Sequence, residues 1–361
     1  MASTLFTPFP LRDLQLPNRI VVSPMCQYMA DDGSANDWHL MHLGQFAMGA
    51  AGLVITEATH VSAIGRISPR CLGLYSDENE KALARVVDFC RKYGVAKMGI
   101  QLAHAGRKAS SLPPAQGGKP LTAEQGAWKT VAPSALPFGP GWHVPEAMDR
   151  HALLAVKQQF VESAKRAARI GFDLVELHAA HGYLLHEFLS PISNQRTDEY
   201  GGSLANRMRY PLEVFDAVRA AWPKERPLGV RVSATDWIDG GWTPEETVVF
   251  ASQMKAHGCD FFDVSSGALD PRQQIPFAPG YNVPFGEKVK KESGMATMSV
   301  GMITRPQQAE DIVSGGKADL IAIARGAMDD PRWAWHAARE LGGEALYSAN
   351  YQRCTPAVWK P

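Results

Sequence analysis

The chain has 361 residues, with 37 basic and 37 acidic side chains and a formal net charge of zero. Hydrophobic residues make up 45% of it and charged residues 20%, which is typical of a folded globular protein and excludes a disordered or collagen-like chain. The balanced charge argues against a nucleic-acid partner, because a large surface for nucleic acid needs an excess of basic residues. We therefore expect small molecules as partners.

The cysteines and the apolar runs indicate a protein of the cell interior. Five cysteines occur without a CxxC pair, so we expect reduced thiols and no zinc or disulfide framework. The N-terminal residues lack the basic and apolar regions of a secretory signal. The longest run without a polar residue, 46–55, is about half of the roughly 20 residues that cross a bilayer. These features predict a cytoplasmic location and no membrane partner.

Eight short apolar or β-branched runs alternate with longer segments of helical periodicity, the pattern of repeated βα units. The predicted strands are 19–24, 52–57, 96–102, 173–178, 228–233, 260–265, 296–300 and 319–324. The predicted helices are 78–93, 153–170, 206–222, 244–257, 284–293 and 306–314. This alternation predicts an α/β fold, a (β/α)₈ TIM barrel with an N-terminal hairpin. We assign 1–345 to a single barrel domain and 346–361 to a C-terminal extension.

A doubly wound nucleotide-binding sheet is the alternative fold, and its fingerprint is missing. No GxGxxG run occurs. Neither Gly-Gly-Lys run completes a Walker loop, because a proline or an alanine stands where the hydroxyl residue should be. The barrel is therefore the favoured fold.

Local signals place two helix starts and one long insertion. Thr243 stands directly before Pro244, and Thr304 stands two residues before Pro306; we expect them to cap helices 244–257 and 306–314. Residues 104–146 contain seven prolines and six glycines and interrupt the repeat after the third strand. A loop of this length in a compact domain usually has a function. We interpret 104–150 as a lid over the mouth of the barrel.

Catalytic groups in such a barrel lie at the carboxyl ends of the strands. The fourth strand ends at His178, and His181 and Tyr183 follow. Two imidazoles can hydrogen-bond one developing oxyanion while a phenol donates a proton. The histidines could instead be structural, or could bind zinc in a metal-dependent hydrolase barrel. Arg231, at the end of the fifth strand, opposes a nearby cation, so we predict no metal.

Basic and polar strand ends predict an anionic, heterocyclic ligand. Arg231 and Arg325 end the fifth and eighth strands, where fixed positive charges suit an anion. Gly301 and Arg325 fall in the region where this fold usually binds phosphate. Gln101, at the end of the third strand, can donate and accept hydrogen bonds toward a pyrimidine-like ring. We expect these arginines to gather positive charge at the barrel mouth.

Four segments carry a family resemblance: 23–26 (SPMC), 101–108 (QLAHAGRK), 176–184 (ELHAAHGYL) and 196–203 (RTDEYGGS). Together they resemble the Old Yellow Enzyme family of flavin-dependent ene-reductases. The resemblance runs from Leu5 to about Arg353. Cys26 and Tyr28 are similar to the thermophilic-like branch, which includes xenobiotic reductases.

The resemblance implies noncovalent FMN at the barrel mouth. The cofactor contacts carried over by position are Ser23, Pro24, Met25, Cys26, Ala58, Gln101, His178, Arg231, Gly301, Ala324 and Arg325. Cys26 would tune the flavin potential, Gln101 would bond the pyrimidine edge, and Arg231 would stabilise negative charge near flavin N1. Ala324 stands where the family often has glycine. Alanine also has a backbone N–H, so donation of a hydrogen bond from the backbone to the phosphate remains possible.

The resemblance also implies a ping-pong reduction of the C=C bond of activated alkenes, such as α,β-unsaturated aldehydes and ketones, maleimides and nitro compounds. NADPH or NADH reduces FMN and leaves, and hydride then passes from flavin N5 to the β-carbon of the alkene. His178 and His181 would hold the carbonyl or nitro oxygen, and Tyr183 would protonate the α-carbon. A non-catalytic flavin-binding barrel is the alternative, although a proton donor has no use without turnover.

In this branch Tyr28 and Ile67 would shape the substrate pocket together with the two histidines and the proton donor. Ala103, where the other branch often has tryptophan, would leave the pocket roomier. Residues 351–353 resemble a segment that lends an arginine to a neighbouring subunit, so Arg353 is a candidate substrate contact across an interface. We therefore expect a homodimer or a homotetramer.

Overall fold

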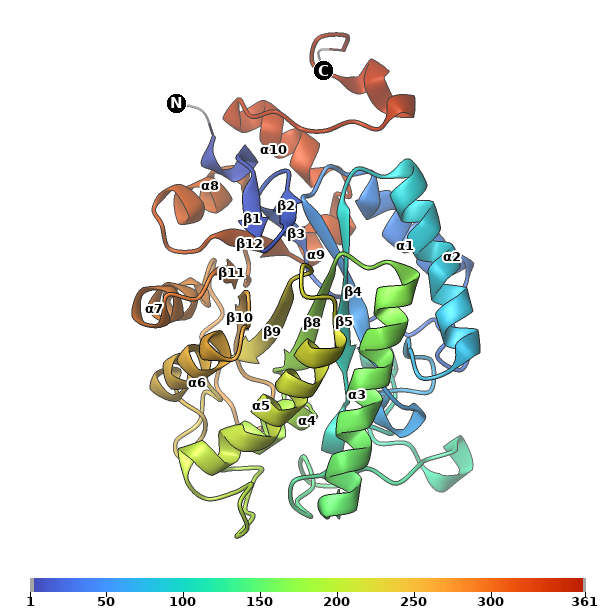
Figure 1. Cartoon of the computed structure of the whole chain (residues 1–361), viewed down its shortest axis with the longest axis vertical. Helices are drawn as coiled ribbons and strands as arrows, with labels where there is room; N and C mark the ends of the chain where they lie inside the picture. Colours follow the sequence, from blue (N-terminus) through green and yellow to red (C-terminus); the bar gives the residue numbers. More distant parts are fainter. Residues whose placement is uncertain (1–2, 360–361) are drawn as a thin grey trace.

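Eight parallel strands close into a barrel at the centre of the computed structural model, which describes residues 3–359 (Figure 1). Around the barrel the strands follow the order β10-β11-β12-β3-β4-β5-β8-β9. They are β3 (Ile20–Val22), β4 (Leu53–His60), β5 (Lys97–Ala103), β8 (Leu174–Ala179), β9 (Leu228–Ser233), β10 (Phe262–Ser265), β11 (Thr297–Ser299) and β12 (Leu320–Ile323). Every predicted strand overlaps one of them, and the predicted (β/α)₈ barrel is confirmed.

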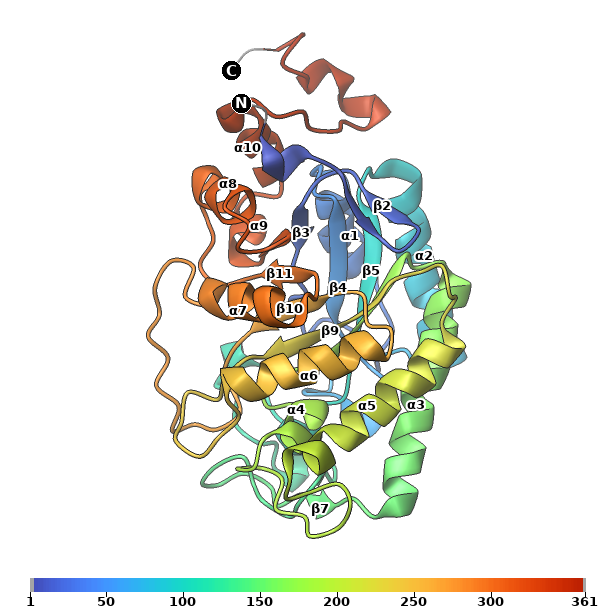
Figure 2. The ribbon, with the colours of Figure 1, turned by 60° about the vertical axis from the view of Figure 1, so that its left-hand side comes forward.

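Helices surround the barrel, as the two views show (Figures 1 and 2). They are α1 (Asp37–Ala47), α2 (Asp77–Tyr93), α3 (Arg150–Ile170), α4 (Leu184–Leu189), α5 (Leu204–Ala221), α6 (Pro244–Ala256), α7 (Val283–Ser293), α8 (Pro306–Ser314), α9 (Arg325–Asp329) and α10 (Trp333–Leu341). The sequence periodicity did not predict α1, because the apolar end of this helix continues into β4 without a polar residue between them. Among residues 3–359, no helix is long and apolar enough to cross a membrane.

One of the two predicted helix caps is present. Thr243 Oγ1 accepts the amide of Glu246 at 3.2 Å, and the Glu246 carboxylate accepts the Thr243 amide at 3.1 Å, so α6 begins with a capping box. The prediction for α8 is wrong. Its N-cap position is occupied by Arg305, which leaves Thr304 outside the helix.

The N-terminal hairpin covers the amino-terminal end of the barrel. β1 (Phe9–Leu11) pairs antiparallel with β2 (Leu14–Leu16), and Leu11 and Leu16 are buried. Their partners lie at or near the starts of the barrel strands: Val21, Leu53, Leu174, Phe261, Met298 and Leu320. Because apolar side chains fill this end, the polar carboxyl ends of the strands lie at the opposite end.

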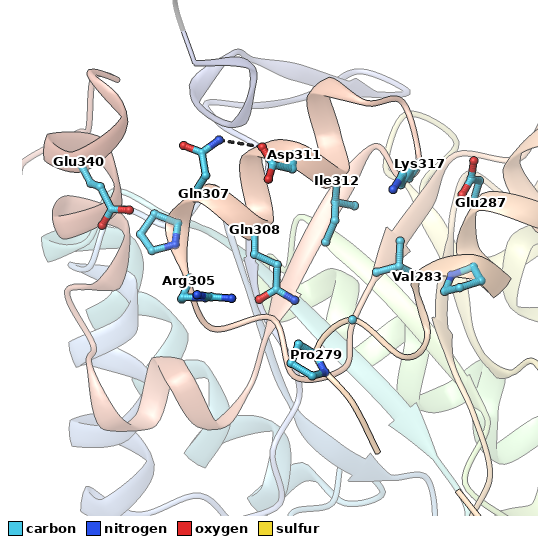
Figure 3. Close-up of a pocket in the computed structure, with 13 residues that line it drawn as sticks. Pro279, Val283, Glu287, Arg305, Gln307, Gln308, Asp311, Ile312, Lys317 and Glu340 are labelled. Atoms are coloured by element: carbon cyan, nitrogen blue, oxygen red, sulfur yellow. Dashed lines mark hydrogen bonds between the residues drawn. The ribbon is translucent and has the colours of Figure 1, made fainter. Parts of the chain in front are cut away.

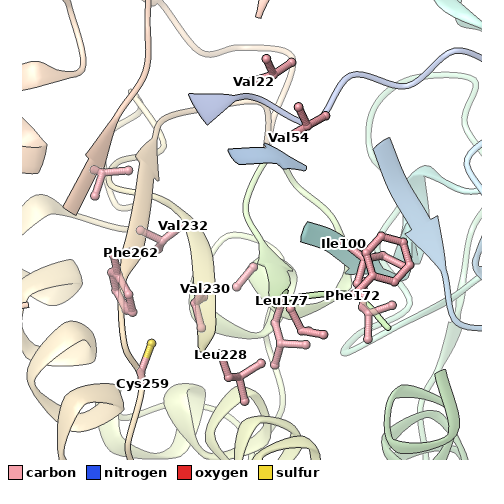
Figure 4. Close-up of a cluster of buried hydrophobic side chains, with 14 of the residues drawn as sticks. Val22, Val54, Ile100, Phe172, Leu177, Leu228, Val230, Val232, Cys259 and Phe262 are labelled. Carbon is pink, nitrogen blue, oxygen red and sulfur yellow. The ribbon is translucent and has the colours of Figure 1, made fainter. Parts of the chain in front are cut away.

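A larger apolar cluster fills the space between the barrel and its helices. Figure 4 shows part of it, including Leu177 on β8, Val230 on β9 and Phe262 on β10. All three side chains are at most 1% exposed. Burial on both faces is why the strands of a parallel barrel consist of nearly continuous apolar residues rather than of an alternating pattern.

The register between strands aligns the polar residues of the barrel. His178 on β8 is paired with Arg231 on β9, which is paired with Asp263 on β10. Glu176 on β8 is paired with Gln101 on β5. Paired residues on neighbouring strands point to the same face of a sheet, so these side chains lie next to one another although they come from distant parts of the sequence.

Two irregular segments lie at opposite ends of the molecule in both views (Figures 1 and 2). Residues 104–150 contain η3 (Gly106–Lys108) and a small parallel pair, β6 (Val131–Ala132) and β7 (Glu146–Ala147). The Arg107 guanidinium donates to the Leu269 carbonyl at 2.9 Å, which ties this segment to the loop after β10. Its action as a lid stays a prediction. The other segment is the C-terminal extension.

Candidate active site

The turn after β8 brings His178, His181 and Tyr183 together. The ring centroids of His178 and His181 are 5.1 Å apart with an angle of 88° between the planes. The Tyr183 ring lies 5.0 Å from His178 at 90°. His178 is buried, while His181 and Tyr183 are half-buried. The three residues predicted to act on substrate therefore share one small region at the end of the fourth barrel strand.

The backbone of this turn is left-handed at two successive residues. The φ angles are 58° at His181 and 71° at Gly182, and a Cβ at Gly182 would lie 2.3 Å from the Ala268 carbonyl oxygen. The His181 amide donates to Ser233 Oγ at 2.9 Å. The Lys108 ammonium donates to the His181 carbonyl at 2.8 Å. A left-handed histidine is strained, and such strain is concentrated at functional sites.

Both histidines are neutral at physiological pH. Burial, then the neighbouring His181 and Arg231, holds the pKa of His178 well below its usual value. Burial and Arg231 do the same to the pKa of His181. His178 Nδ1 accepts the Ala180 amide at 3.2 Å, so the ring proton is on Nε2. His181 Nε2 lies 2.8 Å from Ser265 Oγ, and its Nδ1 keeps the proton when that hydroxyl donates. The pair can then offer two N–H groups to one oxygen.

An apolar wall lines the other side of the turn. Cys26, Tyr28 and Tyr183 pack against a small cluster that includes Ile67 and Cys71. Burial raises the pKa of the Tyr183 phenol well above its ordinary value and raises the pKa of Cys26 to about 12. At neutral pH Tyr183 therefore keeps a proton that it can donate, and Cys26 is a thiol.

Buried carboxylates partner the polar strand ends, and this corrects one expectation. Arg231 Nε lies 3.1 Å from Asp263 Oδ2, with the Asp263 side chain fully buried. Gln101 Nε2 donates to Glu176 Oε1 at 2.7 Å. Burial raises the pKa of Glu176, which favours the neutral acid. The expected concentration of positive charge is wrong at Arg231, because Asp263 balances the guanidinium.

A cavity of about 440 Å³ opens beside Arg231 at the ends of the last strands. Its lining includes Arg231, Ser265, Tyr281, Asn282, Gly301, Ala324 and Arg325. Gly301 has a φ of 122°, and a Cβ there would lie 2.9 Å from Asn282 Nδ2. Within residues 3–359, Asn282 Nδ2 is a buried donor without a hydrogen-bond partner. An unsatisfied donor beside a glycine cradle fits an anion, and sites for small molecules measure roughly 300–1,000 Å³. The residues present thus fit FMN.

The remaining predicted cofactor contacts lie at the same end of the barrel. Ser23, Pro24 and Met25 directly follow β3. Ala58 in β4 is paired with Gln101 in β5, just after an irregularity in the register. Within the described residues, the buried hydroxyl of Ser23 has no hydrogen-bond partner. A planar ring over these strand ends would find both an apolar surface and polar groups at its edge.

Sequence reasoning missed Lys108 as a part of the site. Its ammonium donates to the carbonyls of His181 and Ala268 at 2.8 Å each and lies 5.2 Å from the centre of the Tyr183 ring. Burial, then the nearby Arg107, lowers its pKa to about 7. The sequence feature that could have pointed to Lys108 is its position at the end of the QLAHAGRK segment. Its partners are carbonyls on two other loops, which the sequence does not reveal.

A larger hollow, of about 770 Å³, lies between α7 and α8 (Figure 3). Glu287, Arg305 and Lys317 are among its lining residues. It contains none of the residues predicted to bind cofactor or substrate. Size alone therefore does not identify the site, because the reactive groups lie at the strand ends.

Arg353 does not join this site within one chain. It lies on η6 (Ala349–Cys354) and is exposed. The extension that carries it is at the end of the molecule opposite residues 104–150 (Figures 1 and 2). An action of Arg353 on substrate therefore requires a second subunit.

His60, at the end of β4, is a buried histidine near the turn, and it should make the protein sensitive to acid. Burial is the main cause that lowers its pKa from 6.5 to about 3. Between these two values the unfolded chain binds the proton and the folded chain does not, so the free energy of unfolding falls as the pH falls. One such proton contributes at most about 1.4 kcal/mol per pH unit.

We expect the His60→Leu variant to lose less stability than the wild type between pH 6.5 and pH 4. Urea unfolding at several pH values in this range measures the difference. Equal slopes for the two proteins would show that His60 does not contribute to the acid sensitivity.

Comparisons with known proteins extend over nearly the whole chain. Residues 4–344 match the family described as the NADH:flavin oxidoreductase / NADH oxidase family. NADPH dehydrogenase of Geobacillus sp. (strain WCH70) is 44% identical over 355 residues, which is 98% of this chain and 99% of the relative. NADPH dehydrogenase of Bacillus subtilis (strain 168) has the same identity and coverage. Among solved structures, morphinone reductase has a TM-score of 0.79 and 26% identity, covering 96% of this chain and 91% of that protein.

Proposed function

Because the chain belongs to the NADH:flavin oxidoreductase / NADH oxidase family, the Old Yellow Enzyme family, we propose that it reduces the C=C bond of activated alkenes. The protein is an FMN-dependent oxidoreductase that takes its electrons from NADPH, and the proposal concerns the acceptor. The acceptor class is α,β-unsaturated aldehydes and ketones, maleimides and nitroalkenes. NADPH and the alkene would react in turn at one site.

The observation that carries this proposal is the pair of neutral imidazoles beside a protonated phenol. Hydride addition to an α,β-unsaturated carbonyl builds negative charge on the oxygen. His178 and His181, with ring centroids 5.1 Å apart, would donate to that oxygen together. Donors that are held in place before the reaction stabilise such charge without reorganisation.

FMN, when bound, supplies the hydride that it has received from NADPH. The chain supplies the proton: Tyr183 is held beside His178, and its raised pKa keeps it protonated. The apolar cluster around Cys26, Tyr28 and Ile67 would exclude water from the carbon that receives the proton. We assign Tyr183 the role of general acid.

We propose that FMN is held by three groups of residues at the strand ends. Asn282, Gly301, Ala324 and Arg325 would hold the phosphate, with Arg231 close by. Ser23, Pro24, Met25, Cys26 and Ala58 would line the ring. Gln101 would bond the edge of the pyrimidine, and its side chain is oriented for this by Glu176.

A visible spectrum with and without a phenol tests the proposed site. We expect the purified protein to be yellow, and 4-hydroxybenzaldehyde to add a long-wavelength charge-transfer band. The phenolate oxygen would occupy the place of the substrate oxygen between the two histidines. Reduction of 2-cyclohexenone by NADPH measures the proposed activity directly. A flavin-loaded enzyme that reduces no activated alkene would contradict the proposal.

Arg353 is proposed to complete the substrate site of a neighbouring subunit in a homodimer or homotetramer. The extension lies at the end of the molecule opposite residues 104–150 (Figure 2), so truncation before Tyr351 should raise KM for the alkene only if subunits exchange this segment. Steady-state kinetics and sedimentation of the truncated protein test this. Unchanged kinetics together with an unchanged oligomer size would exclude the role. The cytoplasmic location also stays a prediction.

A further inference from the structure

The turn after β8 is also contacted by a residue that takes no part in the proposed reaction. The Gly182 amide, between His181 and Tyr183, donates to Nδ1 of His186 at 2.9 Å. His186 lies on α4, and its side chain is fully buried. A histidine that accepts through Nδ1 carries its proton on Nε2, so the tautomer of His186 follows from this hydrogen bond.

A buried carboxylate faces that proton. His186 Nε2 lies 2.9 Å from Asp236 Oδ1, and both side chains are 0% exposed. The ring N–H does not point straight at the oxygen, so the contact is an attraction between a charge and a dipole. Asp236 is itself held, because its Oδ2 accepts from Ser190 Oγ at 2.6 Å and from the Trp242 amide at 2.7 Å. A fixed carboxylate thus orients the imidazole.

Two other polar groups of the turn have partners on different elements. The His181 amide is bound by Ser233, and the His181 carbonyl by Lys108. The Gly182 amide is therefore the group whose direction depends on His186. The left-handed backbone at His181 is strained, and such a conformation persists only when the surrounding structure holds it.

We propose that His186, oriented by Asp236, is a positioning residue that holds the turn so that the His181 imidazole and the Tyr183 phenol face the same substrate. This inference rests on the proposed function of the turn. Because the His186 side chain is fully buried, it would act through the turn rather than by contact with substrate or cofactor. Residues that orient metal ligands typically change activity by about 10- to 100-fold when they are replaced, and we expect an effect of that size for His186.

Two substitutions separate this role from packing. His186→Leu removes the acceptor for the Gly182 amide and fills most of the same volume. His186→Asn keeps an oxygen where Nδ1 lies now, and so retains that acceptor. We expect His186→Leu to keep its FMN but to lose about 10- to 100-fold in kcat for 2-cyclohexenone and in affinity for 4-hydroxybenzaldehyde, read from the charge-transfer band. His186→Asn should recover most of both.

A buried histidine outside the turn provides the matched control. His42, on α1, is 7% exposed and packs against Phe46. His42→Leu should leave kcat and phenol affinity unchanged within about twofold. A folded, FMN-loaded His186→Leu protein with wild-type kcat and phenol affinity would overturn the inference, and so would a His186→Asn protein no better than His186→Leu. A wild type that reduces no alkene would instead contradict the proposed function.

If His186→Leu does not fold, nitrogen NMR of the wild type tests the positioning role of His186 instead. In ¹⁵N-histidine-labelled enzyme, the signal that disappears in His186→Asn is assigned to His186. We expect an unprotonated Nδ1 and a protonated Nε2 for this residue at neutral pH. A proton on Nδ1 would exclude the hydrogen bond from Gly182 and with it the positioning role.

Discussion

Alkene reduction by the Tyr183→Phe enzyme is expected to be about 10²- to 10⁴-fold slower than by the wild type, because a general acid typically contributes a rate factor of this size. The reason is the environment of the phenol. Tyr183 stays protonated because burial raises its pKa. The Lys108 ammonium, whose pKa is lowered to about 7, also lies beside the ring, but it donates to the carbonyls of His181 and Ala268. Removing one hydroxyl therefore removes the proton source.

Stopped-flow measurements can assign this loss to one half-reaction. Reduction of the flavin by NADPH needs no proton from Tyr183, so its rate should change little in Tyr183→Phe. Nearly all of the rate loss should appear in the reoxidation of the flavin by 2-cyclohexenone. Equal losses in both half-reactions would point to a general disturbance of the site instead.

Tyr210 provides a matched tyrosine-to-phenylalanine control. It is fully buried on α5, and its hydroxyl donates to the Leu153 carbonyl at 3.0 Å. Tyr210→Phe should lose about 1 kcal/mol of stability with that hydrogen bond while alkene reduction stays within about twofold of the wild type. A wild-type rate in Tyr183→Phe would remove this tyrosine from the proposed mechanism.

Replacing His178 with alanine is expected to weaken the binding of phenols and slow alkene reduction by about 10²- to 10³-fold, as the loss of an oxyanion donor does. The Nε2 proton of His178 is available because Nδ1 already accepts the Ala180 amide. FMN should remain bound, since the proposed phosphate contacts lie in the cavity around Gly301 and Arg325. Flavin content, phenol titration and steady-state kinetics measure these three quantities.

Conservative and distant substitutions complete this experiment. His178→Asn retains an N–H donor on a shorter side chain and should recover part of the loss. His42→Ala, another buried histidine replaced by alanine, should leave phenol affinity unchanged. An unaltered affinity for 4-hydroxybenzaldehyde in His178→Ala would mean that this imidazole does not hold the substrate oxygen.

Much of the site could be predicted because it follows a regular rule of the fold. Parallel strands of a barrel all end on one side, so polar residues that follow apolar runs must meet there. His178, Gln101 and Arg231 lie at such positions and could be found without knowing any contact. Helix α1 could not be found, because a helix that runs into a buried strand leaves one continuous apolar segment.

The partners of the buried charges could not be predicted. Asp263 lies within a predicted strand, and nothing in the local pattern shows that it neutralises Arg231. His186 likewise appears as one residue of a short helix, and only the structure places it between Gly182 and Asp236. Arg231 and Asp263 are 32 residues apart along the chain and His186 and Asp236 are 50 apart, so these pairs depend on how separate βα units are placed against each other.

The sequence by itself determined the (β/α)₈ barrel, the strand ends that carry His178, His181 and Tyr183, and the family through its four segments, because local periodicity and motif spacing are properties of the chain. Only the tertiary structure decided the charge and orientation of those groups. Burial makes the histidines neutral, Asp263 cancels the charge of Arg231, and His186 faces the turn. Each of these depends on which distant residues exclude water or stand within hydrogen-bond distance, and only folding brings such residues together.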